Sequence, residues 1–159
     1  MSKPRVYLLS YTPEPEKIVF AAARVCYSNK GIEGVLSEVG MRDGSSFISS
    51  VVKRGHHSVL EHAVFTFGIE GISRACSHQL VRHRIASYSQ QSQRYVSFER
   101  GFSFVMPDSI RKSPLKEKVE LFLEDVRKLY GELIEHGVPK EDARYVLPSG
   151  VTTNIVVTM

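Results

Sequence analysis

The sequence is poor in cysteine, with only Cys26 and Cys76, and neither belongs to a C-x-x-C motif. This spacing gives no sign of a disulfide framework or of a cysteine-rich zinc site. Isolated free cysteines usually behave as small buried apolar side chains, so we expect both thiols to be buried. Free thiols persist in a reducing compartment, and we therefore expect a cytoplasmic protein.

The chain also lacks an apolar run of about 18 residues, a signal-peptide pattern, internal repeats and low-complexity linkers. We therefore expect a soluble protein with no membrane partner. Its 159 residues, 42% hydrophobic and 24% charged, predict one globular domain over residues 1–159. The net charge of +4 is a mild basic excess, which suits an anionic small molecule or a nucleic acid.

Hydrophobic periodicity predicts an α+β fold with a mixed or antiparallel sheet flanked by helices. Strands are expected over residues 5–10, 63–69 and 151–159, with a strand or extended loop over 96–105. The aromatic strand at 63–69 is expected to be central. Helices are expected over residues 14–27, 35–41, 43–54, 72–81, 113–136 and 140–147.

The longest predicted helix, over residues 113–136, has the clearest signals. Ser113 and Pro114 are typical of an N-cap and a first helical residue. An apolar stripe at helical spacing should face the core. It consists of Val119, Phe122, Leu123, Val126, Leu129, Tyr130 and Leu133. For the helix over 43–54, Asp43 and Ser45 are the cap candidates.

Residues 55–62 read G-H-H-S-V-L-E-H, and three histidines with a glutamate raise the question of a metal site. His57 and Glu61 have the i, i+4 spacing that places two ligands on one helix face, but no third ligand is evident nearby. Ser58, followed three residues later by Glu61, matches a capping box. We therefore favour a helix start at Ser58 over a metal site.

The most unusual stretch covers residues 79–95 and reads Q-L-V-R-H-R-I-A-S-Y-S-Q-Q-S-Q-R-Y. It contains three arginines, one histidine, three serines and four glutamines, but no glycine. Guanidinium forks and short hydroxyls donate hydrogen bonds to phosphate or to rows of carbonyl oxygens. Neither helix nor strand periodicity explains the composition. The stretch therefore predicts a binding site for phosphate or for a row of carbonyl oxygens.

Other interpretations of this stretch stay open. A basic loop can simply be solvated. Arginines interleaved with Tyr88, Tyr95 and the phenylalanines that follow are also typical of a nucleic-acid-binding module, which grips phosphates and stacks bases. Against this module, basic residues are spread evenly outside the stretch, and no RRM, KH or OB signature is present. Ser92 has no base placed for it by the sequence, which favours phosphate binding over a nucleophilic role.

The stretch also carries a resemblance. R-H-R, then seven residues, then S-x-R, over residues 82–94, resembles the signature of the flavin-dependent thymidylate synthases. Residues 55–67 are similar to that family's G-H-x-S-x-x-E-H…F-T-F segment, and Gln79 stands where the family keeps a glutamine. Residues 143–148, A-R-Y-V-L-P, resemble its A-R-x-x-L-P segment. The resemblance covers the chain from residue 55 to its end, in the right order.

This resemblance implies a role for each matching position. The residues beside the flavin and folate, implied to be catalytic, are His56 and Arg82. Those implied to bind FAD are Ser58, Arg82, His83, Arg84 and Gln90. Those implied to bind dUMP, chiefly its phosphate, are Gln79, Leu80, Val81, Arg82, Gln90, Gln91, Ser92, Gln93, Arg94 and Arg144.

The resemblance implies reductive methylation of dUMP to dTMP, with methylenetetrahydrofolate as carbon donor and NADPH reducing the FAD. Since hydride would leave the flavin, the protein need only orient the rings and polarise the pyrimidine. No cysteine nucleophile is required, in agreement with two isolated thiols. A homotetramer with active sites shared between subunits is also implied, without a nucleic-acid partner.

Two positions depart from the family pattern. Some members have an acid where this chain has Gln90. We therefore expect Gln90 to form hydrogen bonds and not to act as a general base. The family normally continues past the last strand with an N-x-R segment and a helix, whereas this sequence stops at Met159. We therefore expect a C-terminally short domain that binds ligands poorly and turns over slowly or not at all. A catalytically inactive, truncated paralogue with a structural role is the remaining alternative.

Overall fold

The computed structural model of the protein describes residues 3–39, 44–98 and 101–159. Over these residues the strands are β1 (Arg5–Tyr11), β2 (Phe65–Ser73), β3 (Ser87–Gln90) and β4 (Thr152–Thr158). The α-helices are α1 (Pro15–Val25), α2 (Ile32–Leu36), α3 (Gly44–Lys53), α4 (Arg74–Leu80), α5 (Asp108–Arg111), α6 (Lys116–Glu135) and α7 (Lys140–Ala143). The 3₁₀ helices are η1 (His57–His62) and η2 (Arg144–Val146).

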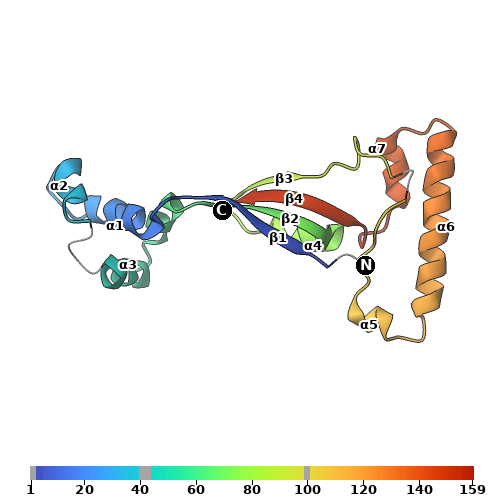
Figure 1. Cartoon of the computed structure of the whole chain (residues 1–159), viewed down its shortest axis with the longest axis horizontal. Coiled ribbons are helices and arrows are strands. Elements are labelled where there is room, and N and C mark those ends of the chain that lie inside the picture. The colour runs from blue at the N-terminus through green and yellow to red at the C-terminus, as the bar shows by residue number, and fades with distance from the viewer. Residues whose placement is uncertain (1–2, 40–43, 99–100) are drawn as a thin grey trace. The chain divides into compact units, whose positions relative to one another are not determined.

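The strands form an antiparallel sheet in the order β1-β2-β4-β3 (Figure 1). Phe65 in β2 and Met159 after β4 exchange backbone hydrogen bonds of 2.8 and 3.0 Å, which is the pattern of an antiparallel pair. The predicted α+β class is confirmed, and β2 is an inner strand, as its aromatic sequence predicts. The expected helices other than 35–41 are found, with ends shifted by a few residues.

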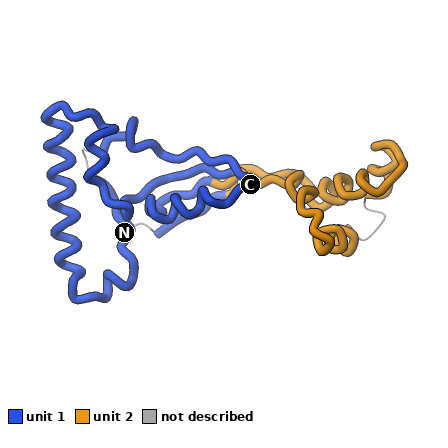
Figure 2. The backbone as a smooth tube through the Cα atoms, turned by 180° about the vertical axis from the view of Figure 1, so that it is seen from behind, with its two compact units in different colours: residues 1–7, 68–157 blue, residues 8–67, 158–159 orange. Residues whose placement is uncertain are grey.

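The chain divides into two compact units, shown in different colours in Figure 2. The first unit consists of residues 1–7 and 68–157, and the second of residues 8–67 and 158–159. Two compact units can belong to one domain, so the single domain stays a prediction.

The core of the first unit lies where α6 meets the segment before it. Leu123 and Val126 of α6 pack against Phe102, Met106 and Val151, all of them buried. This burial anchors both the segment that follows the arginine-rich stretch and the start of β4.

Two predictions for α6 were wrong. Phe122 and Leu129 are exposed, because each lies about 100° around the helix from the buried row that contains Leu123 and Tyr130. The helix begins at Lys116 and has no side-chain cap, since the Ser113 hydroxyl accepts a hydrogen bond of 3.2 Å from the Leu115 amide in the preceding turn. That turn follows α5, which the sequence did not predict.

The core of the second unit joins α1, α3 and η1. Val19 and Ala23 of α1 pack against Val51 of α3 and Val59 of η1. In place of the helix expected over 35–41, the structure has α2, which ends at Leu36, and residues 40–41 lie outside the described residues. The predicted cap at Asp43 lies outside the described residues.

The capping box predicted at Ser58 is also wrong. Ser58 lies inside η1, whose N-cap residue is His56, and no side chain caps this end. Gly55, with φ of +88°, ends α3 just before it, so only a six-residue 3₁₀ helix fits before β2. Among the described residues, no group of three or more histidine, cysteine, aspartate or glutamate side chains could hold a metal.

Both cysteines are exposed, which contradicts their predicted burial. Cys26 is the C-cap residue of α1. Cys76 precedes the buried Ser77 in α4 and therefore points about 100° away from the packed face. In the part of the chain that the structure describes, no helix is long and apolar enough to cross a membrane.

Candidate functional site

The arginine-rich stretch at 79–95 is built from the end of α4, an exposed turn and β3. The helix expected over 72–81 predicted its first residues, whereas no strand was predicted at β3. Ser73 caps α4, its hydroxyl accepting a hydrogen bond of 3.0 Å from the Cys76 amide. In the predicted strand or loop at 96–105, of which residues 99–100 lie outside the described residues, Phe104 forms an antiparallel bridge with Val151, next to β4. The stretch is therefore held at both ends.

A buried polar cluster fixes α4 on the sheet. The Gln90 side chain donates from Nε2 to the Ser77 hydroxyl at 2.6 Å and to the Thr153 hydroxyl at 3.2 Å. Ser77 in turn donates to the Arg74 carbonyl at 2.9 Å. Ser77 and Thr153 are fully buried, so the amide nitrogen of Gln90 is committed to the fold, and only its carbonyl oxygen remains for a ligand.

The turn between α4 and β3 presents Arg82, His83 and Arg84, which are all exposed. No described residue accepts a hydrogen bond from these three side chains, so their donors are free for a ligand. The Tyr88 hydroxyl donates to the carbonyls of Leu80 (3.0 Å) and His83 (2.9 Å) and braces the turn. Ile85, which follows Arg84 in this turn, has φ of +62°, a conformation that β-branched residues avoid.

A cluster of arginines forms around the end of the stretch. Arg94 pairs with Glu141 of α7 at 3.0 Å, and the Arg144 Nε donates to the carbonyl of Glu141 at 2.9 Å. Arg74 donates to the carbonyl of Gln91 at 3.2 Å. Burial, together with the nearby positive charge of Arg144, lowers the pKa of Arg74. These arginines create a local positive field that favours an anion.

Arg74 is a candidate site residue that the sequence interpretation missed. It is the first residue of α4, where the helix dipole disfavours a positive charge. A basic residue in that position, just ahead of the arginine-rich stretch, is the signal that could have identified it.

The structure locates the predicted site residues in both units. Those of the first unit are Gln79, Leu80, Val81, Arg82, His83, Arg84, Gln90, Gln91, Ser92, Gln93, Arg94 and Arg144. They lie on α4, the turn, β3, the loop after it and η2. The predicted residues of the second unit are His56 and Ser58, both exposed.

His56 has an aromatic neighbour, Tyr27, that the sequence did not single out. Its ring meets the Tyr27 ring edge-on, with centroids 6.1 Å apart. The Arg54 guanidinium lies over the same Tyr27 ring, 5.3 Å from its centroid. The result is an exposed cluster with an aromatic surface and a positive charge, which can contact a planar or anionic ligand.

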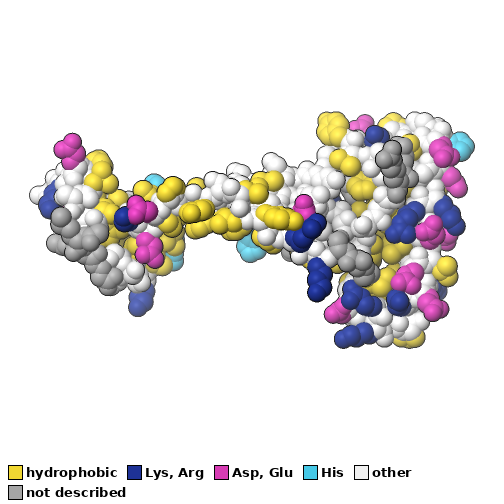
Figure 3. All heavy atoms as spheres, in the orientation of Figure 1, with side chains coloured by type: hydrophobic (Ala, Val, Ile, Leu, Met, Phe, Trp, Pro, Cys, Tyr) yellow, Lys and Arg dark blue, Asp and Glu magenta, His cyan; other side chains and the backbone are white. Residues whose placement is uncertain are grey.

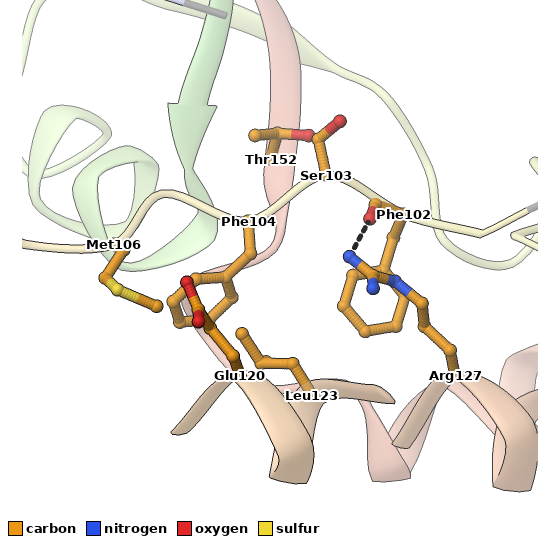
Figure 4. Close-up of a pocket in the computed structure, with 8 residues that line it drawn as sticks. All are labelled: Phe102, Ser103, Phe104, Met106, Glu120, Leu123, Arg127 and Thr152. Carbon is orange, nitrogen blue, oxygen red and sulfur yellow. Dashed lines mark hydrogen bonds between the residues drawn. The ribbon is translucent and has the colours of Figure 1, made fainter. Parts of the chain in front are cut away.

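The first unit also has a cavity of about 360 Å³ that is lined by no residue of the arginine-rich stretch (Figure 4). Its lining residues are Phe102, Ser103, Phe104, Met106, Glu120, Leu123, Arg127 and Thr152. The Arg127 guanidinium already donates to the Phe102 carbonyl at 3.1 Å and pairs with Glu124 at 3.0 Å. The Glu120 carboxylate, which points toward Phe104, would repel an anion. The arginine cluster is therefore the better phosphate site.

Comparisons with known proteins identify the family of the chain. The sequence model of the family described as "Thymidylate synthase complementing protein" matches residues 7–159. A protein of Geobacter sulfurreducens named "Flavin-dependent thymidylate synthase" is 51% identical over 157 residues, covering 98% of this chain and 68% of the relative. Proteins of the same name from Thermococcus onnurineus and Sulfolobus acidocaldarius are 45% and 47% identical.

The chain spans 65% of the Thermococcus protein and 60% of the Sulfolobus protein, while 98% of the chain is matched in each case. The family match and the identities extend over nearly all of this chain, including both groups of candidate site residues. The chain therefore belongs to the thymidylate synthase complementing protein family.

Proposed function

We propose that the chain acts as a flavin-dependent thymidylate synthase, which methylates dUMP to dTMP with methylenetetrahydrofolate as carbon donor. The arginine cluster is the observation that carries this proposal. Arg74, Arg94 and Arg144 contribute three positive charges against the single negative charge of Glu141, an excess of two. A nucleotide phosphate carries about two negative charges at neutral pH, so it matches this excess.

The nucleotide phosphate binds to Ser92, Arg94, Arg144 and Arg74. The Ser92 hydroxyl accepts a hydrogen bond of 3.1 Å from the Arg94 amide, which leaves its own proton free for a phosphate oxygen. The remaining residues assigned to the nucleotide are Gln79, Leu80, Val81, Arg82, Gln90, Gln91 and Gln93. For Gln90, the free carbonyl oxygen limits this role to accepting a hydrogen bond.

The residues present also fit FAD. The free donors of Arg82, His83 and Arg84 on the turn suit its diphosphate, and Ser58 and Gln90 supply further polar contacts. When bound, FAD supplies hydride transfer after reduction by NADPH. His56 and Arg82 orient the reacting rings and polarise the pyrimidine, and the protein supplies no cysteine nucleophile.

The active protein is a homotetramer in which subunits share active sites. Large apolar residues that stay exposed support this assembly, since a monomer rarely exposes so many together. Figure 3 shows hydrophobic side chains on the surface over the strands. The protein works in the cytoplasm, a proposal that the free thiols of Cys26 and Cys76 support.

Replacing Arg74 tests the proposal. We expect Arg74→Met to weaken dUMP binding at least about tenfold, because a charged hydrogen bond to phosphate contributes about 1.5–3 kcal/mol. Isothermal titration calorimetry measures the affinity, and Lys112→Met, at an exposed position outside the cluster, is the control. Equal dUMP affinity of Arg74→Met and wild type would contradict the role of Arg74.

The flavin spectrum tests the activity as a whole. Flavin absorbance that shifts on adding dUMP would support the proposed activity. A salt-sensitive gel shift with nucleic acid, in the absence of flavin, would support a nucleic-acid-binding module instead. Neither response would support a structural subunit without catalysis.

A further inference from the structure

The Arg94 side chain pairs with a single carboxylate, and its guanidinium lies over the Tyr95 ring, 5.7 Å from the ring centroid. Its Nε and Nη2 atoms lie 3.1 and 3.0 Å from Oε2 of Glu141, which is 47 residues away in the sequence. The two side chains are 52% and 51% exposed. Ion pairs this exposed contribute little to the stability of the fold. The main effect of the contact is therefore to orient the Arg94 guanidinium.

This contact uses only one edge of the guanidinium. Of its five N–H groups, the Nε and one Nη2 hydrogen face Glu141. Nη1 and the other Nη2 hydrogen form a second edge, for which no described residue provides an acceptor. Such an edge matches two oxygens of one phosphate. The anion and the carboxylate can therefore bind Arg94 at the same time.

Glu141 also contacts a second arginine of the cluster. It lies in the first turn of α7, and its backbone carbonyl accepts the hydrogen bond from the Arg144 Nε at 2.9 Å. The backbone of Glu141 thus contacts one guanidinium while its side chain contacts another. A shift of this residue would move both donors relative to each other.

We propose that Glu141 is a positioning residue, whose carboxylate holds Arg94 with its second edge turned to the phosphate of the nucleotide. The proposal rests on the proposed function, in which Arg94 binds that phosphate. The same contact has an opposite interpretation, in which Glu141 occupies Arg94 and must be displaced by the ligand. The two interpretations predict opposite changes in affinity when the carboxylate is removed.

Neutral variants on α7 distinguish the positioning role of Glu141 from the interpretation in which the ligand displaces it. Glu141→Gln and Asp142→Asn each remove one negative charge from neighbouring positions of α7, so they change the long-range attraction for an anion similarly. We expect Glu141→Gln to bind dUMP about three- to fivefold more weakly than Asp142→Asn, the range of an exposed ion pair. Isothermal titration calorimetry on the whole protein measures both affinities.

The Arg94→Ala background shows whether the effect acts through Arg94. We expect Glu141→Gln and Asp142→Asn to bind dUMP equally there, because no guanidinium remains to be positioned. A difference that persists without Arg94 would overturn the proposal, as would dUMP binding by Glu141→Gln that is as tight as by Asp142→Asn.

Failure of the proposed function gives different results. If Arg94→Ala bound dUMP with wild-type affinity, Arg94 would not belong to the phosphate site. If the wild-type protein bound no dUMP, the proposed nucleotide site would be wrong. Either result overturns the positioning role as well. Weak binding by Arg94→Ala together with normal binding by Glu141→Gln would overturn only the positioning role.

Discussion

Gln90 shows how one side chain can serve both the fold and the site. Its amide nitrogen joins Ser77 and Thr153, which are 13 and 63 residues away in the sequence. These partners could not be identified from the sequence, because neither local spacing nor periodicity relates them. By contrast, the guanidinium and hydroxyl groups of the arginine-rich stretch could be identified as a candidate site because so many of them occur within 79–95.

At this position we expect Gln90→Leu to lower the free energy of unfolding by about 1–3 kcal/mol, since two buried hydroxyls lose their donor. Urea denaturation followed by circular dichroism measures the change. Gln79→Leu is the matched control, because Gln79 is exposed on α4, and it should unfold at the wild-type midpoint. Equal midpoints for the two variants would contradict the role of the buried cluster.

At the level of elements, the periodic segments were predicted well and the connections poorly. β2, β4 and α6 have long hydrophobic patterns, and their positions were confirmed within a few residues. The short helix α5 was missed, and η1 was predicted only as a helix start at Ser58, because a six-residue or four-residue helix has too few positions to show a period. Their ends depend on tertiary contacts instead.

The second unit has an ion cluster whose effect depends on pH. Glu38 accepts hydrogen bonds from Arg24 at 2.8 Å and Lys30 at 2.6 Å, which lower its pKa from 4.5 to about 2. Its contribution to stability is therefore complete above pH 4.5 and is lost as the pH falls toward 2. We expect Glu38→Gln to flatten the loss of stability over this range.

Urea denaturation between pH 4.5 and 2 checks this expectation. Glu33→Gln removes an exposed carboxylate in the neighbouring α2 and serves as the control, with an expected wild-type slope. If Glu38→Gln kept the wild-type slope, the cluster would not be the source of this acid sensitivity.

The start of β4 depends on a glycine. A Cβ atom at Gly150 would overlap the ring of Phe104, so we expect Gly150→Ala to destabilise the protein by about 1–3 kcal/mol. Gly131→Ala, where a Cβ meets open space within α6, should instead stabilise it by about 0.5–1 kcal/mol. Opposite shifts in thermal unfolding temperature would confirm both, and a stable Gly150→Ala variant would show that Phe104 can move aside.

For the whole molecule, β1 is the strongest indication of assembly. It is an edge strand, exposed along its entire length, and its large side chains are mostly apolar. Since sequence alternation predicts a strand but not what covers it, the sequence could not show which surface is buried in an oligomer. That information depends on contacts between chains.

We expect Leu9→Asp, at a position that is 56% exposed, to reduce the oligomeric mass in light scattering coupled to size exclusion. A charge placed in an apolar interface has no partner and disfavours association. Ser49→Asp adds the same charge at an exposed polar position of α3 and should leave the mass unchanged. An unchanged mass for Leu9→Asp would exclude this part of β1 from the interface.

The left-handed backbone at Ile85 has a consequence for how tightly a ligand can be held. A conformation of this kind costs roughly 1–3 kcal/mol during folding, and the Tyr88 hydroxyl braces the turn by donating to the carbonyls of Leu80 and His83, which precede Ile85. The main-chain entropy of Arg82, His83 and Arg84 is therefore lost when the protein folds, before any cofactor arrives. The backbone therefore loses less conformational entropy when a ligand binds, so a larger part of the free energy of each new hydrogen bond contributes to the affinity.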